Sequence, residues 1–389
     1  MAIKSNNAGG ENTNRKKANS KKKKKQQIKI FIFIAEILII LAMLFVVWKV
    51  FMATDEADGP QFTTVEPSDV IINEDVKENI EASVPDGEEE PKIKGYWNIA
   101  LFGLDAKDSD HLTSGSRSDS IMVASINKDT GDIKLVSVYR DTYLNIGNDR
   151  YTKCNAAYSK GGAAQAISML NMNLDLNITD FVAVGYVALA ECVDALGGVW
   201  IDVDSEELRH INNYQISIVN DLAEFTEADY IKVEKSGYQL LNGLQVAGYC
   251  RIRATAGSDF ARAERQREVI KAMADQAKKA NINTLTDIAT KVAKHVYTDI
   301  DVKDIIELLK NIADYEIVEE GGFPRSDLWA NANMDADGAC VVPTDLEKNV
   351  VWLHEFLFEE TDYTVSSTVS ECCQVIKDKT AAHIEKIRE

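Results

Sequence analysis

The sequence of 389 residues predicts an α/β fold, an α/β/α sandwich with helices on both faces of a central mixed sheet, preceded by one N-terminal transmembrane helix. Two observations carry this prediction. Through 97–280, short apolar runs that reach a Gly or a charged residue alternate with segments whose apolar residues have helical spacing, a pattern typical of α/β sandwiches. Before that region, 30–47 is a run of eighteen residues with one charge, at Glu36.

The apolar run follows a strongly basic tail. Residues 1–29 contain ten Lys or Arg and one acid, Glu11. About 20 apolar residues span a bilayer as a helix, and the positive-inside rule places a basic flank in the cytoplasm. A cleaved signal peptide is the alternative, but its apolar core is usually about 7–15 residues long and a small-residue cleavage site follows it. The sequence therefore predicts a cytoplasmic tail at 1–29, a membrane helix at 30–52 and a single-pass cell-membrane protein with an extracellular C-terminal domain.

Beyond the predicted helix the chain is acidic. Residues 53–95 combine clustered Asp and Glu with Pro60, Pro67, Pro85 and Pro91. This composition buries too little apolar surface to offset the entropy of ordering, so it predicts a flexible stalk. The 360 residues after the basic tail carry 33 basic and 61 acidic side chains. Such a balance repels a polyphosphate backbone and argues against general nucleic-acid binding.

The elements of the exterior domain follow in order. Strands are predicted at 98–105, at 120–127 and 133–140 around a KDTG turn, and at 181–186 and 199–204. Helices are predicted at 161–174, at 186–196, at 239–253 opening at Asn242, and at 259–280 with Asp259 as N-cap. Further helices are expected near 284–296, 301–313 and 344–357, before an acidic end. Residues 96–280 form the predicted catalytic domain, and 281–389 are its extension or an accessory region.

Arginines gather at the ends of these elements. Six of them follow apolar strands or begin the long helix: Arg117, Arg140, Arg251, Arg253, Arg262 and Arg265. Ligand crevices of open α/β sheets lie outside the strand ends, and converging guanidinium groups suit a polyanion such as pyrophosphate. The alternative for any one arginine is a pair with one of the many surface acids.

Carboxylates accompany the arginines. Asp105 and Asp119 stand at strand boundaries and could share Mg²⁺, which prefers oxygen ligands. Asp259, Arg262 and Gln266 have the spacing of one helix face. The histidines do not stand at the spacing of a zinc site on a helix, and the chain contains no GxSxG, GKS/T loop or GxGxxG. A zinc site built on histidines, a serine hydrolase of the nucleophile-elbow type, a P-loop NTPase and a dinucleotide enzyme are therefore disfavoured.

Several segments, taken together and in order, resemble the motifs of the LytR-CpsA-Psr family. They are SRSDSIMVASIN (116–127), LVSVYRDTYLNI (135–146), YTKCNAAYSKGG (151–162), CVDALGGVWIDV (192–203) and GYCRIRATAGSDFARAERQR (248–267). The resemblance covers about half the chain, and the anchor and stalk fit the family's usual architecture. Tyr139 departs from the pattern, because many members have Pro there, and Cys154 occupies a usually aliphatic position.

The resemblance implies an extracytoplasmic phosphotransferase of mainly Gram-positive bacteria. It would move a teichoic acid or capsular polysaccharide from a polyprenyl pyrophosphate carrier to peptidoglycan. Carried over by motif, the pyrophosphate would be held by Arg117, Arg140, Arg251, Arg253, Arg262 and Gln266. Asp105 and Asp119 would hold Mg²⁺, or Mn²⁺ in its place, and Asp259 would act as base or orienting acid beside Arg140 and Arg262. The lipid tail would lie in an apolar channel walled by 181–196 and 239–250. A polyprenyl pyrophosphate hydrolase and a non-catalytic binder or regulatory, attenuator-like membrane protein are the alternatives.

Overall fold

A computed structural model describes residues 61–62, 69–81, 92–106, 112–253, 258–281, 295–300 and 311–388, with isolated positions between 284 and 308. The predicted cytoplasmic tail and the predicted membrane helix, at 1–29 and 30–52, lie outside these described residues. Among the helices that are described, none combines the length and the apolar character needed to cross a membrane.

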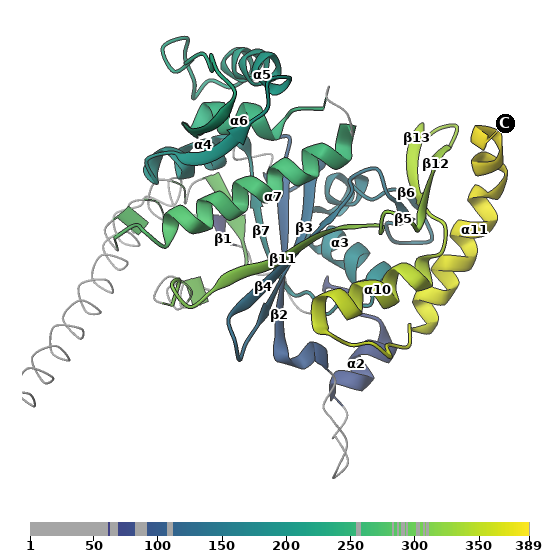
Figure 1. The fold of residues 1–389 in the computed structure, drawn as a ribbon. Helices are drawn as coiled ribbons and strands as arrows, with labels where there is room; N and C mark the ends of the chain where they lie inside the picture. The colour runs from purple at the N-terminus through teal and green to yellow at the C-terminus, as the bar shows by residue number, and fades with distance from the viewer. Residues whose placement is uncertain are drawn as a thin grey trace, which may run out of the picture. The chain divides into compact units, whose positions relative to one another are not determined.

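A mixed sheet of seven strands is the centre of the fold, which confirms the predicted α/β fold with a central mixed sheet (Figure 1). Its middle strand β2 (Tyr96–Leu104) is antiparallel to β3 (Ser118–Asn127) and parallel to β7 (Asp180–Val184). The order is β1-β10-β7-β2-β3-β4-β11. The remaining strands are β1 (Gln61–Phe62), β4 (Asp132–Val138), β10 (Val296–Thr298) and β11 (Glu316–Phe323). The KDTG turn joins β3 and β4 as an antiparallel pair, as predicted.

Helices cover both faces of the sheet because its strands alternate two sets of apolar side chains. Val136 and Val138 of β4 belong to the main core, to which three helices contribute: α3 (Ala156–Leu174), α10 (Leu346–Phe358) and α11 (Ser367–Arg388). Ser137, between them, faces the other way and receives a hydrogen bond of 2.8 Å from Arg267 of α7 (Ser258–Ala277). The long helix α7 therefore lies on the opposite face from α3 (Figure 1).

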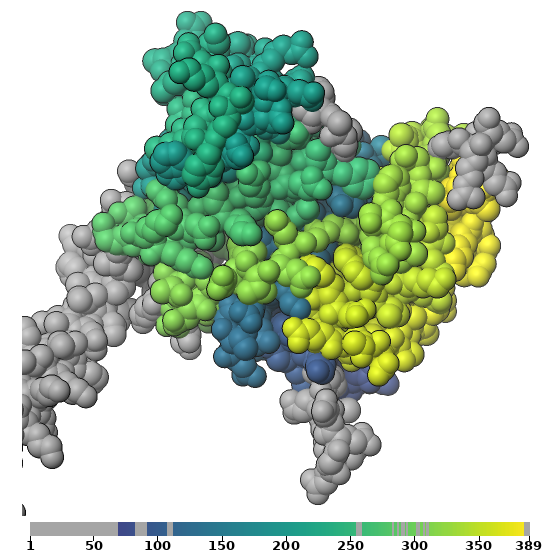
Figure 2. All heavy atoms as spheres, in the orientation of Figure 1, coloured from purple at the N-terminus to yellow at the C-terminus, as the bar shows by residue number. Residues whose placement is uncertain are grey.

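A smaller layer stands at one end of the sheet, with its own apolar core. It contains α4 (Tyr186–Ala195), β8 (Val199–Val203), α5 (Glu207–Asp221), β9 (Gly237–Leu241) and α6 (Gly243–Cys250). Figure 2 shows these residues as a teal-to-green protrusion beyond α7. The helix predicted at 239–253 is instead the strand β9 followed by the shorter α6. Its start at Asn242 is confirmed, because Asn242 and Gln245 form a reciprocal capping box.

The acidic segment before the domain is more ordered than the predicted stalk at 53–95. The helix α2 (Glu74–Glu81) and the short 3-10 helix η2 (Lys92–Gly95) both belong to it. Val70, Val76 and Ile93 are buried, so this segment supplies apolar anchors that its average composition hides. Asn73 also donates a hydrogen bond of 2.5 Å to the carboxylate of Asp175. The prediction of a flexible stalk is therefore wrong for 69–81 and 92–95.

Other boundaries also differ from the prediction. The helix predicted at 161–174 begins five residues earlier as α3, with a break where Gly161 and Gly162 have non-helical backbone angles. Gly162 has a positive φ of 66°, and a Cβ there would lie 2.7 Å from the carbonyl oxygen of Thr113, so the position favours glycine. Asp259 lies within the first turn of α7 and not at its N-cap. The predicted acidic end is the 22-residue helix α11. Residues of the helices expected near 284–296 and 301–313 fall largely outside the described residues.

Two small ribbons complete the domain. They pair β5 (Tyr143–Asn145) with β6 (Tyr151–Lys153), and β12 (Trp329–Asn333) with β13 (Ala339–Pro343). The strands β10 and β11 come from the C-terminal region after residue 280 and hydrogen-bond to β7 and β4. The C-terminal region thus contributes directly to the same sheet as 96–280.

Candidate functional site

The carboxylate of Asp119 is the point where three of the predicted arginines meet. Its Oδ1 accepts a very short hydrogen bond from Nη1 of Arg140, and its Oδ2 accepts one of 2.7 Å from Nη2 of Arg253. Arg262 places Nη1 3.6 Å from the same Oδ2 and donates from Nη2 to the backbone oxygen of Asp119 at 3.2 Å. The convergence expected from the sequence is therefore present for these three side chains.

A β-bulge aims Asp119 at this point. Ser118 pairs with Leu104 and Ser120 with Gly103, so Asp119 is the extra residue on β3. Bulges re-aim a side chain out of the regular alternation and are common beside functional sites. Gly103 permits the local approach of the two strands, because a Cβ there would lie 2.8 Å from the Cβ of Ser120. The sequence analysis recognised Asp119 but had no signal for the bulge that orients it.

A second carboxylate lies on the other side of the arginines. Oδ1 of Asp259 is 2.9 Å from Nη2 of Arg262 and 3.6 Å from Nε of Arg253. The spacing of Asp259 and Arg262 on α7 thus produces the contact that the sequence suggested. Arg140, which follows β4 directly, also approaches Asp141, with Nε 3.6 Å from its Oδ1. Positive and negative groups therefore alternate through the site.

Burial and charge act on these guanidinium groups in opposite directions. Arg262 is 3% exposed, and burial lowers its pKa, with the carboxylate of Asp259 opposing that effect. Burial also tends to lower the pKa of Arg140, but Asp119, Asp141 and Asp259 outweigh it and raise that pKa above its ordinary value. Since arginine remains protonated in proteins even when perturbed, the site is a fixed set of cations at neutral pH.

Arg251 lies at the end of α6, in the small layer. Its guanidinium carbon lies 4.9 Å from the ring centroid of Tyr186 and 5.7 Å from that of Tyr214, both within cation–π range. Burial raises the pKa of Tyr186, and the charges of Asp119 and Asp105 raise it further while Arg251 lowers it. The phenol of Tyr186 therefore lies within electrostatic reach of all three groups. The sequence analysis did not identify Tyr186 as a site residue, although the sequence places it directly after Gly185, at the start of α4.

Asp105 and Arg117 lie together at the ends of β2 and β3. The backbone nitrogen of Asp105 donates to the carbonyl oxygen of Arg117 at 3.3 Å, and both residues are exposed. Asp105 and Asp119 offer only carboxylate oxygens, which fits the ligand preference of Mg²⁺. Both oxygens of Asp119 are already paired with arginines, so a cation there would share this carboxylate with guanidinium groups or displace one.

Two neighbours of the site have supporting contacts. Nε of Arg265 pairs with the buried carboxylate of Glu207, and its Nη1 donates to the carbonyl oxygen of Ile252 at 3.3 Å. Arg265 therefore pairs with an acid, which was the alternative to a role in binding a polyanion. Gln266 donates from Nε2 to the carbonyl oxygen of Cys250 at 3.4 Å. Arg265 and Gln266 thus both connect α7 to the end of α6, close to the turn that carries Arg251 and Arg253.

An aromatic stack borders the site and was not foreseen. The rings of Tyr139 and Phe260 meet edge to face at 4.3 Å, and Phe260 stacks on Trp329 at 4.8 Å. Tyr139 precedes Arg140 and Phe260 follows Asp259, while Trp329 comes from β12 in the C-terminal region. The stack therefore packs both segments against the C-terminal region, which the sequence left without a role.

Two of the helices predicted to wall a lipid channel are in close contact among the described residues. The helices α4 and α6 pack directly, and a Cβ on Gly243 would lie 2.1 Å from the carbonyl oxygen of Ala190. Beside them, a crevice of about 10 Å³ is lined by apolar residues that include Leu112, Val187 and Ala188. That volume is no more than one water molecule needs, so this crevice does not hold a lipid chain in the conformation described.

The fold and the site together define an α/β/α protein with a cluster of arginines and carboxylates at the strand ends. The chain belongs to the LytR_cpsA_psr family, whose profile matches residues 63–341. Such membership confirms the resemblance stated from the motifs.

Named relatives show the extent of the similarity. The chain is 30% identical over 215 residues to the polyisoprenyl-teichoic acid–peptidoglycan teichoic acid transferase TagU of Enterococcus faecalis, covering 54% of this chain and 64% of that relative. It is 27% identical over 301 residues to the corresponding transferase TagV of Bacillus subtilis, covering 74% and 69%. The crystal structure of B. subtilis TagV matches with a TM-score of 0.53 and 25% identity, over 70% of this chain and 99% of that one. The match thus spans slightly less than two thirds of the Enterococcus relative.

Proposed function

We propose that this protein is a membrane-anchored phosphotransferase that moves an anionic glycopolymer, a teichoic acid or a capsular polysaccharide, from a polyprenyl pyrophosphate carrier to peptidoglycan. The observation that carries the proposal is the convergence of Arg140, Arg253 and Arg262 on one carboxylate in a chain with a formal net charge of −19. Named relatives that act as teichoic acid transferases support the substrate class.

The carboxylate of Asp119 stands in for the anion that the arginines would hold in the complex. Guanidinium groups bind carboxylate and phosphate with the same fork geometry, so a diphosphate can replace the carboxylate without a rearrangement of the backbone. Phosphoryl transfer requires mainly positioning and neutralisation of the non-bridging oxygens. Arg251 and Arg117, at the border of the crevice, would add contacts to the second phosphate, while Gln266 would hold the α6 end in place.

The reaction needs one proton acceptor. An oxygen of the acceptor sugar would form a bond to phosphorus, and the bond from that phosphorus to the polyprenyl phosphate oxygen would break. The proton of the sugar hydroxyl would pass to Asp259, whose side chain is 27% exposed. Arg262, 2.9 Å from its Oδ1, would orient the carboxylate. We propose that Asp105 and Asp119 hold Mg²⁺ or Mn²⁺, which when bound would supply additional positive charge to the phosphate oxygens.

The location of the protein follows from the substrate. A lipid-linked donor stays in the bilayer, so the proposal places residues 30–52 across the cell membrane, 1–29 in the cytoplasm and the α/β domain outside. The lipid tail would lie along the predicted walls at 181–196 and 239–250. Nucleic acid is not a proposed partner.

The test uses the full chain in detergent with a polyprenyl pyrophosphate-linked glycan and a peptidoglycan fragment. Arg140→Ala is expected to lower kcat at least about 100-fold, the usual loss for one preorganised contact to a developing charge. Arg209→Ala removes the same charge from an exposed position of α5 and is expected to retain normal turnover. Normal turnover by Arg140→Ala would contradict the site. Free polymer phosphate made equally with and without the acceptor would identify a hydrolase, whereas donor binding without product would identify a binder.

A further inference from the structure

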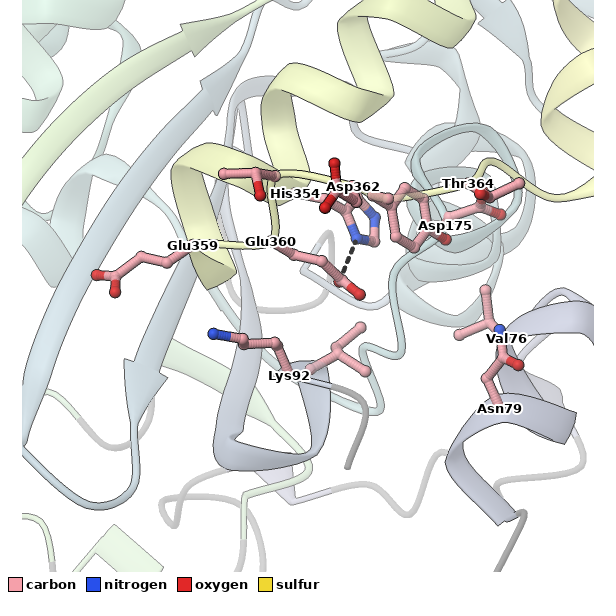
Figure 3. A pocket seen from close by; sticks show the side chains of 12 residues that line it. Val76, Asn79, Lys92, Asp175, His354, Glu359, Glu360, Asp362 and Thr364 are labelled. Atoms are coloured by element: carbon pink, nitrogen blue, oxygen red, sulfur yellow. Dashed lines mark ion pairs between the residues drawn. The ribbon is translucent and has the colours of Figure 1, made fainter. Parts of the chain in front are cut away.

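A cavity and an aromatic face lie outside the arginine cluster. The cavity has a volume of about 550 Å³, and α2, η2 and the end of α10 contribute to its wall (Figure 3). Its charged side chains are partly engaged by the protein itself, because His354 lies 3.8 Å from Glu360 and Glu359 pairs with Lys134 at 3.2 Å. The aromatic face belongs to the ribbon of β8 and β9 and is open to solvent.

The register of this ribbon places four side chains on one outer face. Trp200 stands opposite Leu240 and Asp202 opposite Tyr238, and alternate residues of a strand point to the same side. Trp200, Tyr238 and Leu240 are 45%, 70% and 46% exposed, and Asp202 is exposed as well. These four residues are called the ribbon face.

The ribbon face brings together two exposed aromatic rings. Among the residues whose exposure the structure describes, Trp200 and Tyr238 are the Phe, Tyr or Trp side chains that lie exposed at the surface. Their rings stack with centroids 5.3 Å apart and an interplanar angle of 23°. Large apolar side chains that stay exposed side by side mark binding surfaces, whereas single ones need no explanation. The pair therefore indicates a ligand site.

The inner side of the ribbon holds this face in place. Val199, Ile201 and Leu241 are at most 1% exposed and belong to the core of the small layer. Leu240 packs against the backbone at Gly198, where a Cβ would lie 3.0 Å from the Cγ of Leu240. Because these side chains are already fixed, a ligand would pay little entropy for ordering the face.

The carboxylate of Asp202 decides between classes of ligand. It is the one charged group within β8 and β9, and Asp204 is exposed just beyond the end of β8. An anionic polymer would be repelled by these carboxylates. A bilayer fits poorly, because inserting a carboxylate is costly and interfacial surfaces carry Lys or Arg beside their apolar residues. Nearly parallel rings also do not form the cage that encloses a cation.

A pyranose ring matches what remains. One side of such a ring presents C–H groups, which pack on the face of an aromatic ring, and its edge presents hydroxyl groups. The carboxylate of Asp202 accepts hydrogen bonds from hydroxyl groups, and Leu240 offers apolar contact to the methyl of an N-acetyl group. Four side chains are few for a protein partner, since stable interfaces use about 20–30 residues on each side.

We propose that the ribbon face binds the uncharged sugar backbone of a polysaccharide, which in the proposed reaction is the peptidoglycan acceptor. The role as acceptor site rests on the proposed function. The strand β9 leads into α6, which rises about 12 Å over its eight residues and is followed by Arg251. A polymer that lies on the ribbon face can therefore present a more distant sugar to the arginine cluster. The phosphate-rich donor is excluded from this face by Asp202.

The test titrates chitotetraose, an uncharged chain of β-linked N-acetylglucosamine, into the full chain in lipid nanodiscs by calorimetry. Trp200→Ala is expected to weaken binding at least about tenfold, comparable with the loss of an aromatic stacking partner in other ring-binding sites. Asp202→Asn retains size and is expected to weaken binding about fivefold through the lost charge-assisted hydrogen bond. Val318→Ala removes an exposed apolar side chain from β11 and is expected to bind like the unmodified chain. An unchanged Tm shows that a variant is folded.

Two calorimetric results would overturn the proposal: the absence of chitotetraose binding, and equal affinity of both ribbon variants and the unmodified chain. Nanodiscs of brominated lipid test the bilayer as the occupant. Quenching of the emission that Trp200→Phe removes would place the ribbon face in the membrane and overturn the proposal, whereas unquenched emission supports it.

Failure of this site and failure of the proposed function give different results. Chitotetraose binding that depends on Trp200, in a chain without transferase activity, would refute the proposed function and leave the sugar site standing. Turnover by a chain that does not bind chitotetraose would refute the sugar site alone.

Discussion

Replacing Asp119 by Asn tests whether one carboxylate holds the arginine cluster together. The change retains the size of the side chain and removes the negative charge shared by Arg140, Arg253 and Arg262. Arg253 is 39% exposed, so its pair contributes about 0.2–1 kcal/mol. The side chains of Arg140 and Arg262 are 16% and 4% exposed. Removing one partner of a fully buried pair costs about 3–5 kcal/mol, but Asp141 and Asp259 remain here, which reduces the cost.

The exposed pair and the two partly compensated buried pairs together give an expected loss of about 3 kcal/mol in the free energy of unfolding. Residues 60–389 form one compact unit. At about 2.1 cal/mol/K per residue, a unit of roughly 330 residues unfolds with an entropy of about 0.7 kcal/mol/K, so Tm is expected to fall by about 4 °C. Glu264→Gln is the matched control, because it removes one negative charge from an exposed position on α7. Its Tm is expected to change by less than about 1 °C.

The same variant allows a rescue experiment. In the presence of EDTA, inorganic pyrophosphate is expected to raise the Tm of Asp119→Asn more than that of the unmodified chain. The reason is that the anion supplies the missing charge in the variant but must displace a carboxylate in the unmodified chain. An unchanged Tm would show that Asp119 is not the shared counter-ion. If Tm of Asp119→Asn falls by the expected amount but pyrophosphate does not raise it again, the arginines do not bind a diphosphate.

Three further changes probe other parts of the structure. Glu207→Gln removes the carboxylate charge that pairs with Arg265, which is 8% exposed, and is expected to lower the free energy of unfolding by about 3 kcal/mol in urea; a change below about 1 kcal/mol would contradict the buried pair. Burial raises the pKa of Asp299 to about 6 from its ordinary value of 3.8, so the folded chain binds more protons between these values and its stability rises as pH falls from about 7 to about 4. Asp299→Asn should remove this gradient and stabilise the chain at pH 7.5 by about 1 kcal/mol, after allowance for its partial exposure; an unaltered pH profile of Tm would refute this. Gly322→Ala places a Cβ 1.9 Å from the hydroxyl oxygen of Tyr139 and is expected to cost about 1–3 kcal/mol, part of which Tyr139→Leu should recover; additive effects in the double variant would argue against the clash.

The positions of the site residues could be predicted where they depend on element ends. Arg140 follows an apolar strand, and Asp259 and Arg262 share one turn of a helix, so their convergence follows from local pattern and from the geometry of open sheets. The pairing of Arg265 could not be predicted, because its partner Glu207 lies on α5, a helix that the sequence analysis did not recognise. The bulge at Asp119 is likewise a property of strand pairing, since it depends on which residue of β2 stands opposite.

The parts of the fold that were missed have a common cause. The helix α11 contains many Lys and Glu, and the segment at 69–81 is acidic, so average composition favours solvent exposure for both. Some of their apolar residues nevertheless bury completely or nearly so, as Val76 at 4% and Ile376 at 0% exposure illustrate. Such segments are stabilised by tertiary packing and not by local propensity, which a pattern along the chain does not record.

The charge of the proposed pyrophosphate site is nearly matched to the proposed donor. Five arginines (Arg117, Arg140, Arg251, Arg253 and Arg262) and three carboxylates (Asp105, Asp119 and Asp259) leave an excess of about two positive charges. Asp141 is not counted, because its charge is balanced by Lys153 at 3.2 Å. A diphosphate esterified at both ends carries about two negative charges, so the residues alone can neutralise it. Transfer then releases a phosphate monoester, which adds negative charge on the leaving side. A cation held at Asp105 and Asp119 is therefore expected to raise kcat more than donor affinity, because it would act on charge that develops during the reaction. Titration of Mg²⁺ into donor-binding and turnover assays checks this, and a parallel gain in both quantities would show that the cation serves binding.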